Sequence, residues 1–413
     1  MNKNIINRLI GEMEKLPLID SHEHLPNESE ITGKPADVFT RIYCHYSITN
    51  AITAGMPDDR AMLMDTNIPL EKRWNHFKSF HNAIEDTGYA RAARITARDL
   101  YGIDQINDKT YVELSEKIQA TNKPGLYDKI LKEKCRIERI LNQGSWQDGK
   151  DGYAVLVYRE FMRLCDVNPG TLRELYETWK RLNGGNFENA LDWLSFWCAE
   201  IAKDGAVGLK FSALIPVDCV NDVTAENIFH KLREKTISDQ EASALGTWLI
   251  HKAIASAPKH GFVVAIHCGI SWDGKTNFGA LNPMNIIPLL MKYWDTVFDL
   301  YHGGIPWVRE MAVIGNQYPN ANLNLVWCHQ VSPYMTEHML NEWIDLVPVN
   351  KIIGFGGDNC RGPEKTYGVV RMTFENIARA LAVRISRNQI TEARAVQICR
   401  YWLYENPKRI YGL

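Results

Sequence analysis

The sequence predicts an α/β protein built on a TIM-type (β/α)8 barrel, with a large helical insertion after the first strand. Three observations favour this fold. Short apolar runs alternate with stretches of helical spacing, eight of these runs can form strands, and most of them end in a histidine, lysine or aspartate. The length of 413 residues exceeds the roughly 250 of a simple barrel, and an insertion accounts for the excess. We therefore expect one barrel domain over residues 1–413.

The predicted strands are apolar runs bounded by polar residues. They cover residues 17–22, 136–142, 153–158, 206–211, 262–267, 297–302, 323–329 and 352–358. The long segment between the first two runs carries helix patterns. In residues 69–86 one face is formed by Trp74, Phe77, Phe80 and Ile84. Because this segment leaves the C-terminal end of the first strand, residues 29–134 are predicted to form a helical insertion that caps the barrel mouth.

The composition favours a small-molecule partner. Forty-seven Lys and Arg against 49 Asp and Glu give a net charge of −2, which concentrates neither nucleic acid nor anionic lipid. Nine cysteines without a CxxC pair suit a reducing cytoplasm, where we expect the protein to be found. The sequence contains no run of about 18 apolar residues, so we expect neither a membrane span nor a secretion signal. Assembly into a homo-oligomer stays open.

Polar residues that can bind a metal ion recur at the predicted strand ends. His22 and His24 follow the first run, and the period-two geometry of a strand turns both side chains to the same side. Neutral imidazole is the commonest protein ligand for zinc and related metals. Further strand ends carry His267, His302, His329 and Asp358. Because a barrel gathers the C-terminal ends of its strands on one face, we expect these residues to converge.

Lys210 ends the fourth predicted strand and has three interpretations. Its side chain can simply reach solvent, as lysines that leave an apolar strand often do. It can also be a carboxylated lysine that bridges two metal ions, or a cation that contacts an anionic substrate. Glycine pairs beside His302 and Asp358 would let the backbone approach a ligand closely, although glycine is also common in turns.

The order of these residues resembles the amidohydrolase superfamily. The matching features are the His22-x-His24 pair, His267, the YHGG of residues 301–304 and Asp358, and the residues 406–412 resemble the Asn-x-x-Arg-x-(Phe/Tyr)-Gly ending of that group. The YHGG favours the mononuclear, amidohydrolase-related branch. The resemblance implies a barrel that binds one divalent ion, Zn²⁺ or Mn²⁺.

A second branch, uronate isomerase, also resembles this chain. It has a large helical segment after its first strand, and His45-Tyr46 resembles its substrate-contacting His-Tyr segment. The chain departs from that family where a Lys and an Arg are expected, at Ser47 and Thr49. The Asp-x-Arg expected at strand 8 also differs, since here the arginine is Arg361, three positions after the aspartate.

The sequence thus leads to a hydrolase hypothesis with two alternatives. Four residues are predicted metal ligands: His22, His24, His267 and Asp358. Asp358 would also transfer the proton of a metal-activated water, and His302 would polarise the substrate carbonyl. Substrate binding is assigned to Tyr46, Lys210, His329 and Arg361. The alternatives are an aldose–ketose isomerase of a uronic acid and a protein that binds a small molecule without turnover.

Overall fold

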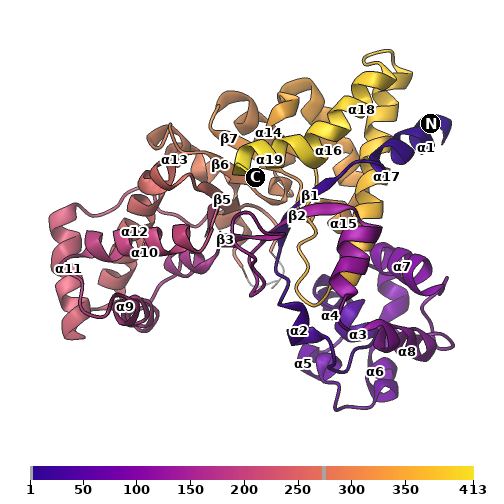
Figure 1. Cartoon of the computed structure of the whole chain (residues 1–413), viewed down its shortest axis with the longest axis horizontal. Coiled ribbons are helices and arrows are strands. Elements are labelled where there is room, and N and C mark those ends of the chain that lie inside the picture. Colours follow the sequence, from indigo (N-terminus) through magenta and orange to yellow (C-terminus); the bar gives the residue numbers. More distant parts are fainter. Residues whose placement is uncertain (1–2, 272–275) are drawn as a thin grey trace. The chain divides into compact units, whose positions relative to one another are not determined.

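The computed structural model describes residues 3–271 and 276–413. Eight strands follow one another in the order β1 to β8 in one sheet, with helices between them along the chain (Figure 1). The strands are β1 (Leu18–Glu23), β2 (Ile137–Asn142), β3 (Ala154–Tyr158), β4 (Gly208–Ser212), β5 (Val263–His267), β6 (Phe298–Leu300), β7 (Ala321–Asn324) and β8 (Ile352–Ile353). This is the TIM-type (β/α)8 barrel, so the predicted fold class is confirmed.

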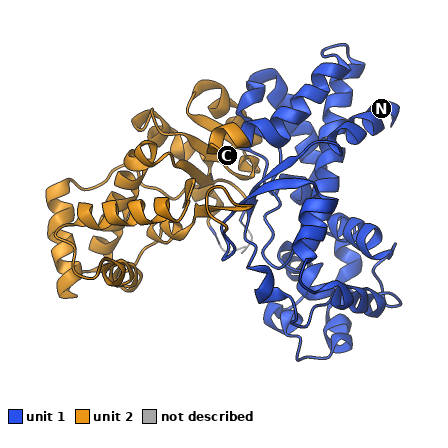
Figure 2. Ribbon diagram, viewed as in Figure 1, with its two compact units in different colours: residues 1–147, 271–276, 324–407 blue, residues 148–270, 277–323, 408–413 orange. Residues whose placement is uncertain are grey.

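The chain divides into two compact units, and each unit is made of stretches that lie far apart in the sequence (Figure 2). Unit 1 comprises residues 1–147, 271–276 and 324–407. Unit 2 comprises residues 148–270, 277–323 and 408–413.

Unit 1 contains β1, β2, β8 and most of the helices before β2 and after β7. Before β2 these are α1 (Lys3–Met13), α2 (Glu28–Ile31), α3 (Val38–Arg41), α4 (Tyr46–Thr53), α5 (Arg60–Met64), α6 (Leu70–Ile84), α7 (Gly88–Tyr101), α8 (Tyr111–Thr121) and the π-helix η1 (Asp128–Lys134). After β7 they are α15 (Cys328–Val331), α16 (Pro333–Leu346), η6 (Val349–Lys351), α17 (Glu364–Ser386), α18 (Glu392–Arg400) and η7 (Tyr401–Glu405). The last helix, α19 (Asn406–Tyr411), runs from unit 1 into unit 2.

The segment between β1 and β2 has an apolar core of its own. Helix α6 forms where the sequence predicts it, and Trp74 and Phe77 on its predicted apolar face are buried. Phe77 packs edge-on against Phe39 of α3 at 5.3 Å between ring centroids, and Trp74 stacks on Tyr111 of α8 at 4.6 Å. Residues 29–134 are therefore a packed helical segment, and their role as a cap over the barrel mouth stays a prediction.

Unit 2 contains the sheet from β3 to β7 and its helices. These are η2 (Glu160–Leu164), α9 (Pro169–Asn183), α10 (Ala190–Lys203), α11 (Asp222–Glu234), α12 (Asp239–His260), η3 (Phe278–Leu281), η4 (Pro283–Ile286), α13 (Ile287–Lys292), η5 (His302–Gly304) and α14 (Val308–Gln317). Strands β4 and β5 pair in parallel over five residues each, from Gly208 opposite Val263 to Ser212 opposite His267. In the described part of the chain, every helix is too short or too polar to cross a membrane.

The last two strands are shorter than the sequence predicts. Strand β7 ends at Asn324 rather than at residue 329, and Trp327 adopts a left-handed conformation with φ of 70° before helix α15 begins. Strand β8 has only two residues, and an extended segment leads from it to Asp358. A continuous apolar run is consistent with a buried strand, a buried loop or a buried helix. The lengths predicted for both strands from apolar composition were therefore too long.

Candidate metal centre

The end of β1 brings His22 and His24 next to Asp358, which follows β8 in the same unit. His22 Nε2 lies 3.1 Å and His24 Nε2 lies 3.4 Å from Asp358 Oδ1. One ligand atom from each of the three residues lies within 4.8 Å of the others. Two imidazole nitrogens and a carboxylate oxygen at this spacing suit Zn²⁺, Mn²⁺ or Fe²⁺, whose bonds to such ligands are about 2.0–2.2 Å long. These three side chains therefore fit a divalent metal ion.

Backbone hydrogen bonds between β1 and the segment after β8 hold the cluster in place. Asp358 N donates to His22 O at 2.8 Å, and His24 N donates to Asn359 O at 2.9 Å. Asp358 itself has φ of 55°, a conformation that costs a non-glycine residue free energy and is found preferentially at functional sites. Burial opposes ionisation of Asp358, but the two histidines outweigh it and hold its pKa well below the usual range.

Two further carboxyl groups lie buried beneath this cluster and were not identified from the sequence. Asp20 Oδ1 accepts from Gly357 N at 3.0 Å, and Glu23 accepts from Asn359 N at 2.5 Å and from Thr366 Oγ1 at 2.8 Å. Burial raises the pKa of Asp20 to about 7, and burial together with the charge of Asp20 raises the pKa of Glu23 well above its ordinary value. Both carboxyl groups thus hold the backbone amides on either side of Asp358.

The glycine pair before Asp358 has a steric reason. A Cβ on Gly357 would collide with the Glu23 carboxylate, and a Cβ on Gly356 would lie 2.8 Å from Ser21 Oγ and from Val326. The backbone can therefore approach β1 only because these two residues lack side chains.

In unit 2, His267 and His302 contact each other. His302 Nε2 lies 3.0 Å from His267 Nδ1, and His267 Nε2 lies 2.8 Å from Ile270 O. His302 has φ of 65° at the start of η5, where Gly303 and Gly304 continue the left-handed turn. The roles of His267 as a metal ligand and of His302 as a catalytic group stay predictions.

Lys210 is a buried residue in unit 2, so it is not a lysine that reaches solvent. Its side chain is 2% exposed, and Nζ lies 5.0 Å from the ring centroid of Tyr301 and 3.9 Å from Met162 Sδ. Tyr301 in turn contacts Tyr411, whose hydroxyl donates to Asp299 at 2.7 Å. The role of Lys210 in substrate binding stays a prediction.

A group of aromatic and charged side chains in unit 1, which we call the His45 cluster, consists of His45, Tyr46, Tyr89, Trp327 and Lys365. The His45 ring lies 5.6 Å from Trp327 and 6.1 Å from Tyr89, and its Nδ1 is 3.0 Å from the Tyr89 hydroxyl. Tyr46 contacts both Tyr89 and Trp327, at 5.5 and 5.4 Å between ring centroids. Tyr46, a predicted substrate residue, therefore belongs to an organised aromatic group.

The other two predicted substrate residues of unit 1 differ in their surroundings. Arg361 is exposed, and its backbone oxygen accepts a hydrogen bond from Arg41. His329 lies on α15, is fully buried, and has Nε2 2.8 Å from Gly354 O and Nδ1 3.2 Å from Asn376 Nδ2. Because both ring nitrogens of His329 have partners within the protein, we leave it out of the proposed site.

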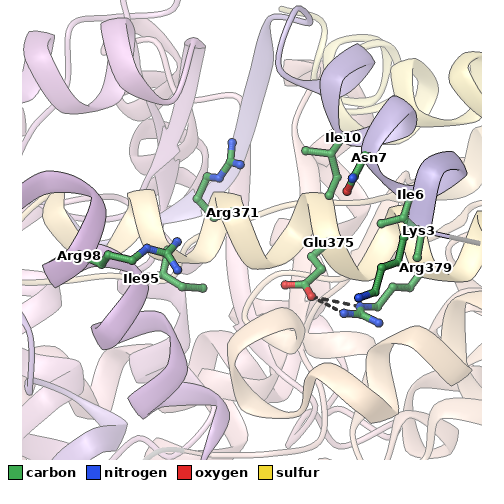
Figure 3. A pocket seen from close by; sticks show the side chains of 9 residues that line it. All are labelled: Lys3, Ile6, Asn7, Ile10, Ile95, Arg98, Arg371, Glu375 and Arg379. Atoms are coloured by element: carbon green, nitrogen blue, oxygen red, sulfur yellow. Dashed lines mark hydrogen bonds and ion pairs between the residues drawn. The ribbon is translucent and has the colours of Figure 1, made fainter. Parts of the chain in front are cut away.

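Unit 1 also has a pocket of about 520 Å³ between α1, α7 and α17, shown in Figure 3. It shares no residue with the metal cluster. Its three arginines are each ion-paired with a carboxylate, as Arg379 is with Glu375 at 2.6 Å and Arg98 is with Asp99 at 2.6 Å. We assign no function to this pocket.

The fold resembles that of two solved sugar-acid isomerases and of one protein described as a metal-dependent hydrolase. A uronate isomerase from Thermotoga maritima superimposes with a TM-score of 0.79 and 15% identity, covering 99% of this chain and 97% of that one. A glucuronate isomerase from Caulobacter crescentus gives 0.80 and 16%, covering 99% and 94%. A Lactobacillus casei protein, provisionally described as a metal-dependent hydrolase, gives 0.65 and 14%, covering 98% and 97%.

These comparisons support the resemblance to both the superfamily and uronate isomerase, at the level of the fold. No family model and no curated protein sequence matches the chain. At identities of 14–16% the shared fold does not decide between isomerase and hydrolase.

Proposed function

We propose that the protein is a metal-dependent isomerase that interconverts the aldose and ketose forms of a uronic acid or a closely related sugar acid. The observation that carries the proposal is the cluster of His22, His24 and Asp358, in a chain that matches two uronate isomerases over nearly its full length. The hydrolase predicted from the sequence becomes the second candidate, because the structure that supports it is less similar.

The residues of unit 1 have distinct roles in this proposal. His22, His24 and Asp358 hold one divalent ion, which would act as a Lewis acid on the sugar oxygens. The neighbouring histidines hold the pKa of Asp358 low, so it is ionised and its negative charge suits a divalent ion. In this proposal Asp358 would also take the proton from C2 and deliver it to C1, while the hydroxyl proton on O2 passes to O1. Burial raises the pKa of Tyr46, so its hydroxyl stays protonated and can donate a hydrogen bond to the substrate.

Hydrolysis is the second candidate because the same donor set serves it. Asp358 would then accept the proton of the attacking water and pass it to the leaving group, while His302 would donate a hydrogen bond to the substrate carbonyl. The third possibility, binding without turnover, is the outcome in which ligands bind but no product forms.

One experiment separates these candidates. The purified protein is analysed for metals and then assayed with D-glucuronate, D-galacturonate, lactones and amides, next to a His22→Ala/His24→Ala double variant. We expect about one equivalent of divalent metal and ketose formation from a uronate, with both lost in the double variant. His338→Ala is the matched control, since His338 is an exposed histidine of the same unit.

The outcomes are distinct. Activity on lactones or amides with none on uronates would replace the isomerase by the hydrolase. Full metal content in the double variant would refute the proposed metal centre. A His267→Ala variant in the same series tests the sequence-based prediction that His267 is a further ligand.

A further inference from the structure

Lys365 in the His45 cluster is a buried cation that lacks a carboxylate partner. It lies in the first turn of α17 and is 1% exposed. Its ammonium group has three donors, and among the described residues its contacts are the backbone oxygen of Cys44 at 3.5 Å and the ring of Tyr89, whose centroid lies 4.2 Å away. No carboxylate in the described chain forms an ion pair with it.

A buried ammonium in these surroundings is unfavourable without an anion. Transferring a charge out of water is costly, and a long hydrogen bond to one carbonyl together with a cation–π contact offsets only part of the cost. The neighbouring Glu364 carboxylate forms its ion pair with Arg41 instead, at 3.5 Å. Asp358 is held by His22 and His24. The charge of Lys365 is therefore not balanced by an ion pair among the described residues.

The rest of the cluster has the properties of a ligand site. His45 and Trp327 have φ of 60° and 70°, so with Asp358 three non-glycine residues of unit 1 have a positive φ, which side chains rarely adopt. Removal of the His45 ring from water, together with the nearby Lys365, lowers the pKa of His45 to about 3, so His45 adds no positive charge to the cluster. Tyr46 is partly exposed, which gives the cluster access to the surface.

We propose that Lys365 binds the carboxylate group of the substrate, with the rings of His45, Tyr46 and Tyr89 surrounding the part of the molecule next to that group. The inference rests on the proposed function, since it assigns the residue that distinguishes a sugar acid from a neutral sugar. A lysine is suited to this role because it presents a compact charge with several donors. It is a specificity residue, whereas the metal cluster supports the reaction itself.

The test compares binding and turnover of an acid and its neutral analogue. Metal-loaded full-length protein is titrated calorimetrically with D-glucuronate, D-galacturonate and D-glucose. In Lys365→Met we expect the Kd and KM for the uronates to rise at least 30-fold, with kcat changed less than fivefold and D-glucose unaffected. Lys365→Arg should restore part of the affinity, because it keeps the charge. Lys351→Met, at a partly buried lysine of the same unit, is the matched control.

Thermal unfolding separates a binding role from a structural one. If Lys365 serves the ligand, Lys365→Met should be as stable as the parent or more stable, because an unpaired buried charge is removed. Unchanged uronate affinity in Lys365→Met, an equal loss for D-glucose, or no uronate binding by the parent protein would overturn the inference. Uronate binding without turnover, lost in Lys365→Met and partly restored in Lys365→Arg, would refute the isomerase function and support the carboxylate site.

Discussion

At the scale of single residues, the candidate metal centre depends on side chains that do not themselves contact the ion. Asp20 and Glu23 lie on the same strand as His22, and their carboxyl groups accept hydrogen bonds from the backbone amides of Gly357 and Asn359. Because β1 is buried throughout its length, neither carboxyl group can exchange these partners for water. The position of Asp358 is thus determined by the strand that carries His22 and His24.

Substitution of Glu23 tests this arrangement. Glu23→Ala leaves Asn359 N and Thr366 Oγ1 without their acceptor, and we expect the free energy of unfolding to fall by on the order of 3 kcal/mol. Glu23→Gln keeps an oxygen in place and should cost less than half as much. Urea unfolding of the metal-free proteins measures both. Equal losses in the two variants would mean that the acceptor oxygen is unimportant.

His329 predicts a dependence of stability on pH. Burial lowers its pKa to about 4, against roughly 6.5 in the unfolded chain, although the Gly354 carbonyl opposes the shift. Between these values the unfolded chain binds a proton that the folded protein does not. The free energy of unfolding should therefore fall by up to roughly 3 kcal/mol as the pH decreases from 6.5 to 4, with no contribution from His329 above pH 7.

A His329→Gln variant isolates this effect from other titrating groups. Its free energy of unfolding is compared with that of the parent protein at pH 7, 5.5 and 4 in urea. The difference in the free energy of unfolding between the two proteins should decrease by roughly 3 kcal/mol from pH 7 to pH 4, because only the parent loses stability through His329. A difference that stays constant across this range would show that His329 titrates normally.

At the scale of secondary structure elements, the close contact of α7 and α17 depends on a glycine. A Cβ at Gly368 would lie 2.5 Å from both Ala92 O and Thr96 Oγ1 of α7. Helix α17 also carries Lys365 and Thr366, so its position determines where these side chains lie. A change in the α7–α17 contact should therefore affect the His45 cluster as well as stability.

Two glycine-to-alanine variants test this contact. Gly368→Ala should reduce the free energy of unfolding by about 1–3 kcal/mol, because the helices must separate to accept the methyl group. Gly11→Ala on α1 is the matched control, since nothing lies within 4 Å of its Cβ position. There the better helix propensity of alanine should stabilise the protein by about 0.5–1 kcal/mol. Thermal unfolding gives both values, and a stabilising Gly368→Ala would contradict the packing described.

At the scale of the whole molecule, metal binding should contribute to stability. A ligand that binds only the folded chain stabilises it by about 2.7 kcal/mol when its free concentration is 100 times Kd. We expect EDTA to lower the melting temperature of the parent protein and added Zn²⁺ or Mn²⁺ to restore it. The His22→Ala/His24→Ala variant should melt at the same temperature with and without EDTA. An equal response of both proteins would place the stabilising ion elsewhere.

The sequence predicts the framework better than the details of the site. Alternating apolar runs are sufficient to predict the barrel and helix α6, because periodicity reports burial directly. The pairing of His22 and His24 also follows from strand geometry. What could not be predicted depends on the route of the backbone between elements: the early end of β7 at the left-handed Trp327, and the turn that aims Asp358 at β1.

Lys365 and Glu23 were missed for a related reason. A lysine in the first turn of a helix and a glutamate between two histidines are usually solvated, and only tertiary packing shows that both are buried here. Conversely, His329 was grouped with the strand-end histidines because the strand before it was predicted too long. The structure places it on a helix, with its ring turned into the protein.

The first and last parts of unit 1 are separated in the sequence by nearly the whole of unit 2, and the bond from Gly357 to Asp20 spans 337 positions. During translation, the segment that carries His22 and His24 leaves the ribosome long before Asp358 is synthesised. Contacts between residues so distant in the sequence form late in folding. The core of unit 1 therefore stays incomplete until the residues after β7 have been synthesised. A chain that ends before Asp358 would lack one of the three proposed metal ligands. Metal binding by the newly made protein would therefore indicate that synthesis had continued past Asp358.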